Sequence, residues 1–168
     1  QTIEEGIERI ADSIKQVLDG YQGKTGLLLE ISAGTGNIIG GRFEEIAKII
    51  DLVEEGFARP SFSTGAEGPI SQSESKNLGW VCFDTCHAFA SGYDLRTPDS
   101  VKAMLKEFDK KIGLDYLKLS HVNDSMVDLG GKRDRHEHIG DGFIGVDGMT
   151  ALLTTLPFQK IDWLLETE

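Results

Sequence analysis

Trp-Val-Cys-Phe-Asp (residues 80–84) is a short apolar run that ends on a residue able to bind a metal ion, and three other runs in the chain end in the same way. Mostly apolar runs of this length are typical of buried parallel strands. The other three are Gly-Leu-Leu-Leu-Glu (26–30), Tyr-Leu-Lys-Leu-Ser-His (116–121) and Trp-Leu-Leu-Glu (163–166). In an α/β barrel, functional groups collect at the C-terminal ends of the strands. The pattern therefore predicts a metal site of oxygen and nitrogen ligands at the ends of four parallel strands.

The segments between these runs indicate crossover helices and loops. We expect strands over 26–32, 79–84, 115–121 and 161–166. Helical spacing and helix-start residues predict helices over 2–18, 42–55, 98–111 and 147–156, with a helical turn from about residue 86 and a polar loop over 123–146. Residues 56–77 are rich in Gly, Ser, Glu and Pro without periodicity, which indicates a surface insertion. This order predicts the α/β class and a TIM (β/α)8 barrel.

The length predicts only part of such a barrel. A complete barrel takes about 250 residues, whereas this chain has 168. We therefore expect residues 1–168 to form a single partial barrel domain with roughly the last four strands, and the N-terminal half to be missing. A small self-contained α/β domain is the alternative.

Composition limits the possible functions and locations. The net charge of −11 argues against a generic nucleic-acid binder, although bound metal ions would return positive charge to acidic ligands. Cys82 and Cys86 are too close in sequence to staple a fold, so we expect a reduced intracellular compartment, the cytoplasm. As metal ligands they are weak candidates. No apolar run reaches the roughly 18 residues of a membrane span.

Two constellations add further ligand candidates. His87 follows Asp84 by one helical turn, so the two side chains can reach neighbouring metal positions. Asp134 and His136 are two residues apart in an extended loop, so both point to one side and can chelate one ion. A solvated salt-bridge cluster is the alternative for that loop. His138 shares the alternation but exceeds the ligand count, and we interpret it as a spare or supporting group.

A glycine-rich loop raises a different possibility. Gly34-Thr35-Gly36 with Gly40 lies between a predicted strand and a helix, as in a dinucleotide-binding fingerprint. The third glycine comes one residue too late, and the polar segment 56–77 stands where the next strand is required. We interpret it as a tight strand-to-helix loop beneath a metal ligand.

At these residues the sequence resembles the endonuclease IV family of zinc-dependent apurinic/apyrimidinic endonucleases. The similarity lies in Phe83–Thr97, His121–Gly145, Leu29–Gly34 and Leu164–Thr167, and it spans nearly the whole chain except the insertion. The resemblance implies a TIM barrel with three zinc ions that repairs double-stranded DNA by cutting 5′ to abasic sites.

The resemblance also implies a role for each candidate residue. Glu30 matches a catalytic carboxylate that bridges the first and second zinc ions. The remaining protein ligands of the second match Asp84, His121 and Glu166, and the ligands of the third match His87, Asp134 and His136. Two histidine ligands of the first ion lie outside this chain, so we expect the fragment alone to be inactive.

The remaining predictions concern substrate contacts and rival functions. Lys132, Arg133 and Arg135 are candidate phosphate contacts, with solvated loop charges as the alternative. A xylose-isomerase-like sugar isomerase or epimerase explains the strand-end ligands with one metal cage, but not His87, Asp134 and His136. A metal-buffering domain without catalysis is a further alternative.

Overall fold

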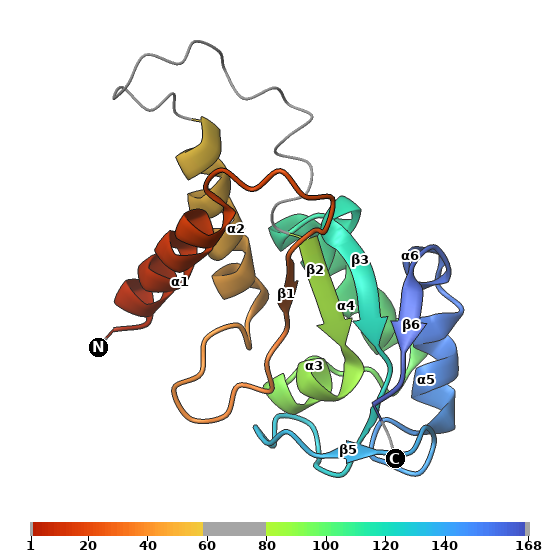
Figure 1. Cartoon of the computed structure of the whole chain (residues 1–168). Coiled ribbons are helices and arrows are strands. Elements are labelled where there is room, and N and C mark those ends of the chain that lie inside the picture. The colour runs from red at the N-terminus through yellow and green to blue at the C-terminus, as the bar shows by residue number, and fades with distance from the viewer. Residues whose placement is uncertain (1, 59–79, 167–168) are drawn as a thin grey trace, which may run out of the picture.

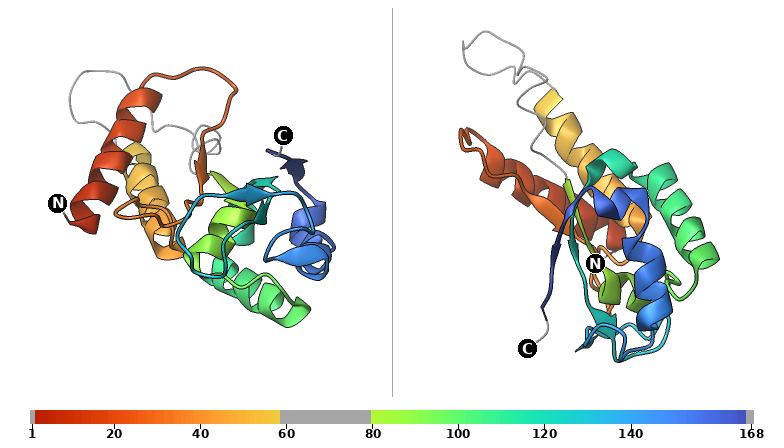
Figure 2. Two further views of the ribbon diagram at one scale, coloured as in Figure 1. Left: turned by 90° about the horizontal axis from the view of Figure 1, so that it is seen from below. Right: turned by 90° about the vertical axis from the view of Figure 1, so that its right-hand side faces the viewer.

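The computed structural model describes residues 2–58 and 80–166 and contains the four predicted strands. They form one parallel sheet in the order β1, β2, β3, β6, comprising Leu28–Glu30, Trp80–Asp84, Leu117–His121 and Asp162–Leu164. Helices α4 (Pro98–Lys111) and α5 (Gly145–Leu153) lie on one side of this sheet (Figures 1 and 2). The prediction of four parallel strands joined by helical crossovers is confirmed.

The helices begin where the sequence places start signals. Helix α1 (Ile3–Leu18) starts with a capping box between Thr2 and Glu5, and α4 starts with the Thr97 cap followed by Pro98. The remaining helices are α2 (Phe43–Ala58), α3 (Thr85–Ser91) and α6 (Leu156–Gln159), with a 3-10 turn, η2, at Leu114–Tyr116.

Several predicted boundaries were wrong. Strand β1 is shorter than 26–32, and β6 ends at Leu164, so Glu166 lies beyond the strand. Helix α2 continues to Ala58, so the predicted insertion does not begin at residue 56, and its residues 59–77 lie outside the described part. The predicted helix 147–156 is two helices, because Thr154 ends α5 and Pro157 lies in the first turn of α6.

The polar loop 123–146 contains structure that the sequence analysis missed. Strand β4 (Asp124–Ser125) pairs antiparallel with β5 (His136–Glu137), and Ser125 lies opposite His136. Strands of two residues carry no detectable periodicity. The pairing folds the loop back beneath the ends of the main strands.

The core lies between the sheet and the helices and fixes the strand ends. Phe43, Phe83 and Phe108 pack together, and Tyr93 stacks on Phe43 with ring centroids 3.8 Å apart. Helix α1 packs on α2 through a second buried cluster that includes Ile7 and Val53. Because Val81 and Phe83 enter the main core, the alternation of side chains turns Cys82 and Asp84 to the opposite face.

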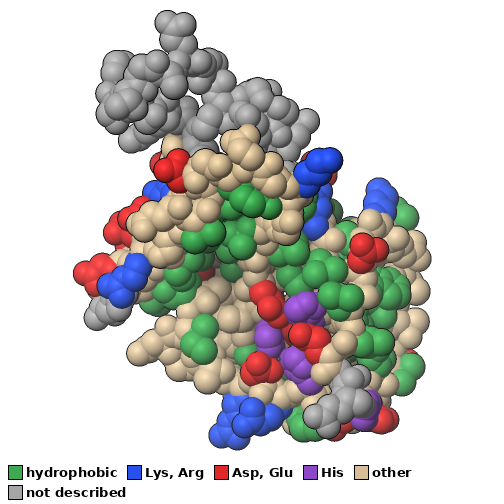
Figure 3. All heavy atoms as spheres, in the orientation of Figure 1, with side chains coloured by type: hydrophobic (Ala, Val, Ile, Leu, Met, Phe, Trp, Pro, Cys, Tyr) green, Lys and Arg blue, Asp and Glu red, His purple; other side chains and the backbone are tan. Residues whose placement is uncertain are grey.

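That opposite face shows apolar side chains at the surface (Figure 3). All three residues of β6 are exposed, and Trp163 keeps 45% of its surface accessible. Within residues 2–58 and 80–166, every helix is too short or too polar to cross a membrane.

Candidate metal centre

Histidine and acidic side chains gather at the C-terminal ends of the strands, where they form a red and purple cluster in Figure 3. The strand register explains part of this arrangement. Asp84 pairs with His121 across β2 and β3, and Glu30 ends the neighbouring β1. Parallel strands end at the same edge of a sheet, so these three ligand candidates meet there.

The first set, the four-residue group, consists of Glu30, Asp84, His121 and Glu166. Each offers one ligand atom, and these atoms all lie within 4.8 Å of one another. The Nδ1 of His121 lies 3.0 Å from Glu30 Oε1, 3.2 Å from Glu166 Oε2 and 3.9 Å from Asp84 Oδ2. Three carboxylates around one imidazole form a donor set that suits a divalent cation.

The second set, the histidine group, consists of His87, Asp134 and His136. Their candidate ligand atoms also lie within 4.8 Å of one another. The Nε2 atoms of His87 and His136 are each 3.2 Å from Asp134 Oδ1. Three convergent ligands of this kind leave a coordination position open for water or substrate.

The hydrogen bonds of the histidine group fit a metal ion. The Nδ1 of His87 lies 2.9 Å from the carbonyl oxygen of Ile31, which can only accept, so Nδ1 carries the proton. In the neutral ring, the lone pair of His87 Nε2 faces Asp134 and His136. Within the described residues, Nε2 of His87 and Nε2 of His136 are buried, and neither makes a well-directed hydrogen bond, although each lies 3.2 Å from Asp134 Oδ1. Buried polar atoms are costly when unpaired, and a bound cation would satisfy both.

The two groups are immediate neighbours. Asp84 Oδ2 lies 3.7 Å from His136 Nε2, and Glu30 Oε1 lies 3.5 Å from His87 Nδ1. Asp84 is fully buried, whereas the Glu30 side chain keeps 41% of its surface exposed. The side chains of Glu166 and Asp134 are also exposed, so the centre opens to solvent along these three carboxylates.

Burial and charge shift the ionisation of this centre. Burial raises the pKa of the Asp84 carboxyl, although the contacts with His87, His136 and Asn123 act in the opposite direction. Burial also lowers the pKa of His87, but the carboxylates of Asp84 and Asp134 outweigh it, so the net shift is upward. The cluster thus favours bound positive charge, which a metal ion can supply.

Both cysteines are free and buried, as the sequence analysis expected for residues that do not staple the fold. Burial raises the pKa of the Cys82 thiol to about 12 and that of Cys86 to about 11. The Cys86 thiol donates to the carbonyl oxygen of Arg135 at 3.3 Å. Cys86 also lies near Asp84 and His136, and its thiol is engaged by the Arg135 carbonyl.

The candidate phosphate contacts lie beside the histidine group. Lys132, Arg133 and Arg135 are exposed, and none of them forms an ion pair with any other described residue. Lys132 adopts a left-handed backbone conformation with φ 51°; its N–H donates to Ala90 O, and its carbonyl accepts from Thr35 Oγ1, both at 2.9 Å. His138 belongs to neither group of described ligand candidates.

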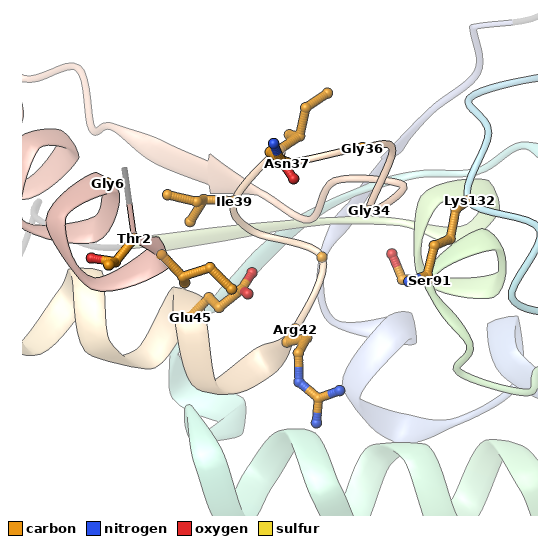
Figure 4. Close-up of a pocket in the computed structure, with 13 residues that line it drawn as sticks. Thr2, Gly6, Gly34, Gly36, Asn37, Ile39, Arg42, Glu45, Ser91 and Lys132 are labelled. Carbon is orange, nitrogen blue, oxygen red and sulfur yellow. The ribbon is translucent and has the colours of Figure 1, made fainter.

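A cavity of about 520 Å³ lies beside the centre, between the start of α1 and the loop before α2 (Figure 4). Gly34, Gly36 and Lys132 contribute to its wall. None of the seven ligand candidates lines it. The glycine-rich loop therefore separates this hollow from the two groups.

Two buried residues of the site were not assigned roles by the sequence analysis. Asn123 donates to two carboxylates of the four-residue group, and Asp124 accepts hydrogen bonds from four backbone N–H groups. They come two and three residues after the strand-ending His121, but this position alone gives no signal of these contacts.

Comparisons with known proteins agree with this architecture. Residues 1–168 match the family model described as "Xylose isomerase-like TIM barrel". Among curated relatives, "Probable endonuclease 4" of Chloroflexus aggregans is 39% identical over 98% of this chain and 51% of the relative, and that of Halothermothrix orenii is 40% identical over 96% and 51%. The crystal structure of endonuclease IV from Thermus thermophilus matches with a TM-score of 0.73 and 30% identity, over 96% of this chain and 51% of that chain. The chain spans about half the length of the curated relatives it matches.

Proposed function

The chain belongs to the xylose isomerase-like TIM barrel family, and from this premise we propose that it forms part of a DNA repair endonuclease that hydrolyses the phosphodiester 5′ to abasic sites. Relatives named endonuclease 4 and the similarity to a solved endonuclease IV support the nuclease class. We propose the abasic substrate because the segments that carry the ligands, Phe83–Thr97 and His121–Gly145, resemble those of the endonuclease IV family.

The observation that carries the proposal is the presence of two ligand groups side by side. The four-residue group provides one cation site, and the histidine group provides another beside it. We propose that both would hold zinc, and that Glu30 would also serve as a ligand of a third zinc whose other ligands lie outside this chain. Adjacent ions suit in-line displacement at a phosphate, in which the entering and departing oxygens both need charge stabilisation.

Zinc ions in this centre would lower the pKa of water and neutralise the phosphate. Glu30 is the exposed carboxylate between the two groups, 3.0 Å from His121 Nδ1 and 3.5 Å from His87 Nδ1. In the proposed reaction, a water molecule beside Glu30 loses a proton to solvent and attacks phosphorus, the bond from phosphorus to the 3′ oxygen breaks, and the departing 3′ oxygen takes up a proton. His87, Asp134 and His136 would hold the ion whose positive charge stabilises the departing oxygen.

Lys132, Arg133 and Arg135 would bind the flanking phosphates. Their loop leads directly into the histidine group, and their cationic ends have no ion-pair partner within the described residues. Such contacts position the duplex without reading its sequence. They also offset locally the repulsion expected from the net charge of −11.

We further propose that residues 1–168 act as one partial barrel domain completed by an N-terminal half. Strands β1 and β6 are the two edges of the described sheet. Additional parallel strands would satisfy the unpaired backbone groups of both edges and cover the apolar face. We call the chain together with that half the full-length protein.

A sugar isomerase or epimerase is the second candidate. The family description and the four-residue group both suit a single-cage isomerase. The histidine group favours the nuclease, because a single-cage reaction gives no reason for a second convergent set of ligand atoms.

The test is incision of duplex DNA that contains one abasic site by the full-length protein. We expect cleavage without a nucleotide cofactor, lost after prolonged chelation and restored by zinc. Glu30→Gln should abolish it, whereas Glu55→Gln, the same change on the exposed surface of α2, should not. Interconversion of sugars or sugar phosphates in place of incision would overturn the proposal.

A further inference from the structure

Asn123 is a buried amide that contacts two carboxylates of the four-residue group. Its side-chain Nδ2 donates to Asp84 Oδ2 at 2.9 Å and to Glu166 Oε2 at 3.0 Å. Its Oδ1 accepts from the backbone N–H of Glu166 at 3.1 Å. Because a backbone N–H can only donate, this bond settles which end of the amide is oxygen. Both amide hydrogens therefore point at carboxylates.

The backbone of Asn123 is held just as firmly. Its N–H donates to Thr85 Oγ1 at 2.8 Å, and the Thr85 hydroxyl donates back to the Asn123 carbonyl at 2.5 Å. Both residues are fully buried. Thr85 directly follows Asp84, so this exchange locks the end of β2 to the end of β3. The amide thus has a fixed position before any ligand binds.

Glu166 depends on this amide more than the other members of the group do. It lies beyond β6, a strand whose residues are all exposed, and its side chain is 41% exposed. Among described residues, its polar partners are Asn123 and the imidazole of His121. A carboxylate on such a segment has many rotamers. Asn123 restricts them, because it donates to the Glu166 carboxylate and accepts from the Glu166 backbone N–H.

We propose that Asn123 is a positioning residue that holds Asp84 and Glu166 at the separation needed to bind one cation with Glu30 and His121. It would not bind the cation itself, because its oxygen is engaged by the Glu166 backbone. A neutral donor suits this task, since it orients two carboxylates without neutralising the charge that attracts the cation. The inference rests on the metal centre of the proposed function.

The test measures cobalt(II) binding to the metal-free full-length protein in a His87→Ala background, which disables the histidine group. The relevant binding step is the one that a further His121→Ala change abolishes. Asn123→Asp has nearly the same shape but cannot donate to both carboxylates, because an ionised carboxyl has no donor and a protonated one has a single O–H. We expect it to weaken this step about 10- to 100-fold, as is usual for residues that orient metal ligands. Asn37→Asp, the same change at an exposed loop position, should leave it unchanged.

A second measurement separates positioning from general damage to the fold. With His87 intact, Asn123→Asp should leave cobalt binding at the histidine group within about threefold of the unchanged protein. If Asn123→Asp does not fold by circular dichroism, Asn123→Ser replaces it, because serine is too short to reach both carboxylates. Equal affinity in the variant and the unchanged protein, or equal loss at both groups, overturns the inference. Absence of the His121-dependent step in the unchanged protein instead overturns the proposed metal centre.

Discussion

Asp124→Asn should loosen the loop that carries the histidine group, because this fully buried carboxylate is the point to which the loop is fastened. Its Oδ1 accepts from the N–H groups of Ser125 and Ile144 at 2.7 and 2.9 Å, and its Oδ2 accepts from those of Gly140 and Gly145, both at 3.0 Å. The four bonds close the loop on itself and hold β4 beside β5, which places His136.

The expected cost follows from counting acceptors. An asparagine side chain has one acceptor oxygen, so in either orientation its NH2 group faces two of the four backbone donors. Each buried donor left unpaired costs about 1–3 kcal/mol. The N–H groups of Gly140 and Gly145 are only partly buried, so the substitution should lower the free energy of unfolding by about 2 kcal/mol when the NH2 group faces them, and by up to about 6 kcal/mol when it faces Ser125 and Ile144. That is a large share of the roughly 5–15 kcal/mol that stabilises a typical domain.

Urea unfolding of the full-length protein, with and without cobalt(II), measures both effects. Asp141→Asn makes the same change at an exposed position of the same loop and should stay within about 0.5 kcal/mol of the unchanged protein. Asp124→Asn should also lose most cobalt binding at the histidine group, since His136 is then no longer held by β4. Matching unfolding curves for Asp124→Asn and Asp141→Asn would refute the reasoning.

Three further predictions concern the centre and its surroundings. His87→Ala and Asp134→Ala should each remove the ion of the histidine group, whereas Glu30→Ala, His121→Ala and Glu166→Ala should perturb the ions bound by the four-residue group. All five substitutions should lower incision by about 100-fold or more. Full metal content with near-normal incision in His87→Ala and Asp134→Ala would show that the histidine group holds no metal. Replacing residues 59–77, a polar and unpatterned segment outside the described residues, by a short Gly-Ser linker should preserve metal content and incision, and a large loss of DNA affinity would instead assign the segment a substrate contact. Residues 1–168 alone should aggregate in light-scattering measurements and lack turnover, because β1 and β6 are sheet edges and Leu165 is 62% exposed; robust multiple-turnover incision by this piece would contradict the proposed completion of the barrel.

The fold could be predicted to a large extent because its determinants are local. Each strand is a short apolar run, and the period-two alternation decides which residues leave the core. Thr97 and Pro98 start α4 at the predicted residue, since capping depends only on neighbours in sequence. Boundaries were less accurate at β1 and β6, where few residues pair, and at the C-terminal ends of α2 and α5, which lie three residues from the predicted ones.

The candidate ligands could be named from sequence for a related reason. Parallel strands joined by crossovers end on one edge of a sheet, so Glu30, Asp84 and His121 had to lie close together once the strands were recognised. His87 follows Asp84 by one turn of α3, and Asp134 and His136 alternate in an extended loop. Local geometry therefore indicated each pair of ligands.

Only the tertiary structure decided how these pairs combine. Asn123 meets Glu166 across 43 positions of sequence and Thr85 across 38, and Asp124 meets Gly145 across 21. Such hydrogen bonds depend on how loops pack after the sheet has formed, and no local pattern encodes them. The sequence by itself determined which residues offer ligand atoms, because strand ends and helix turns follow short-range rules. The packing of loop 123–146 against the strand ends determined their distances and supports, because a buried polar group must find its partner wherever the fold brings one.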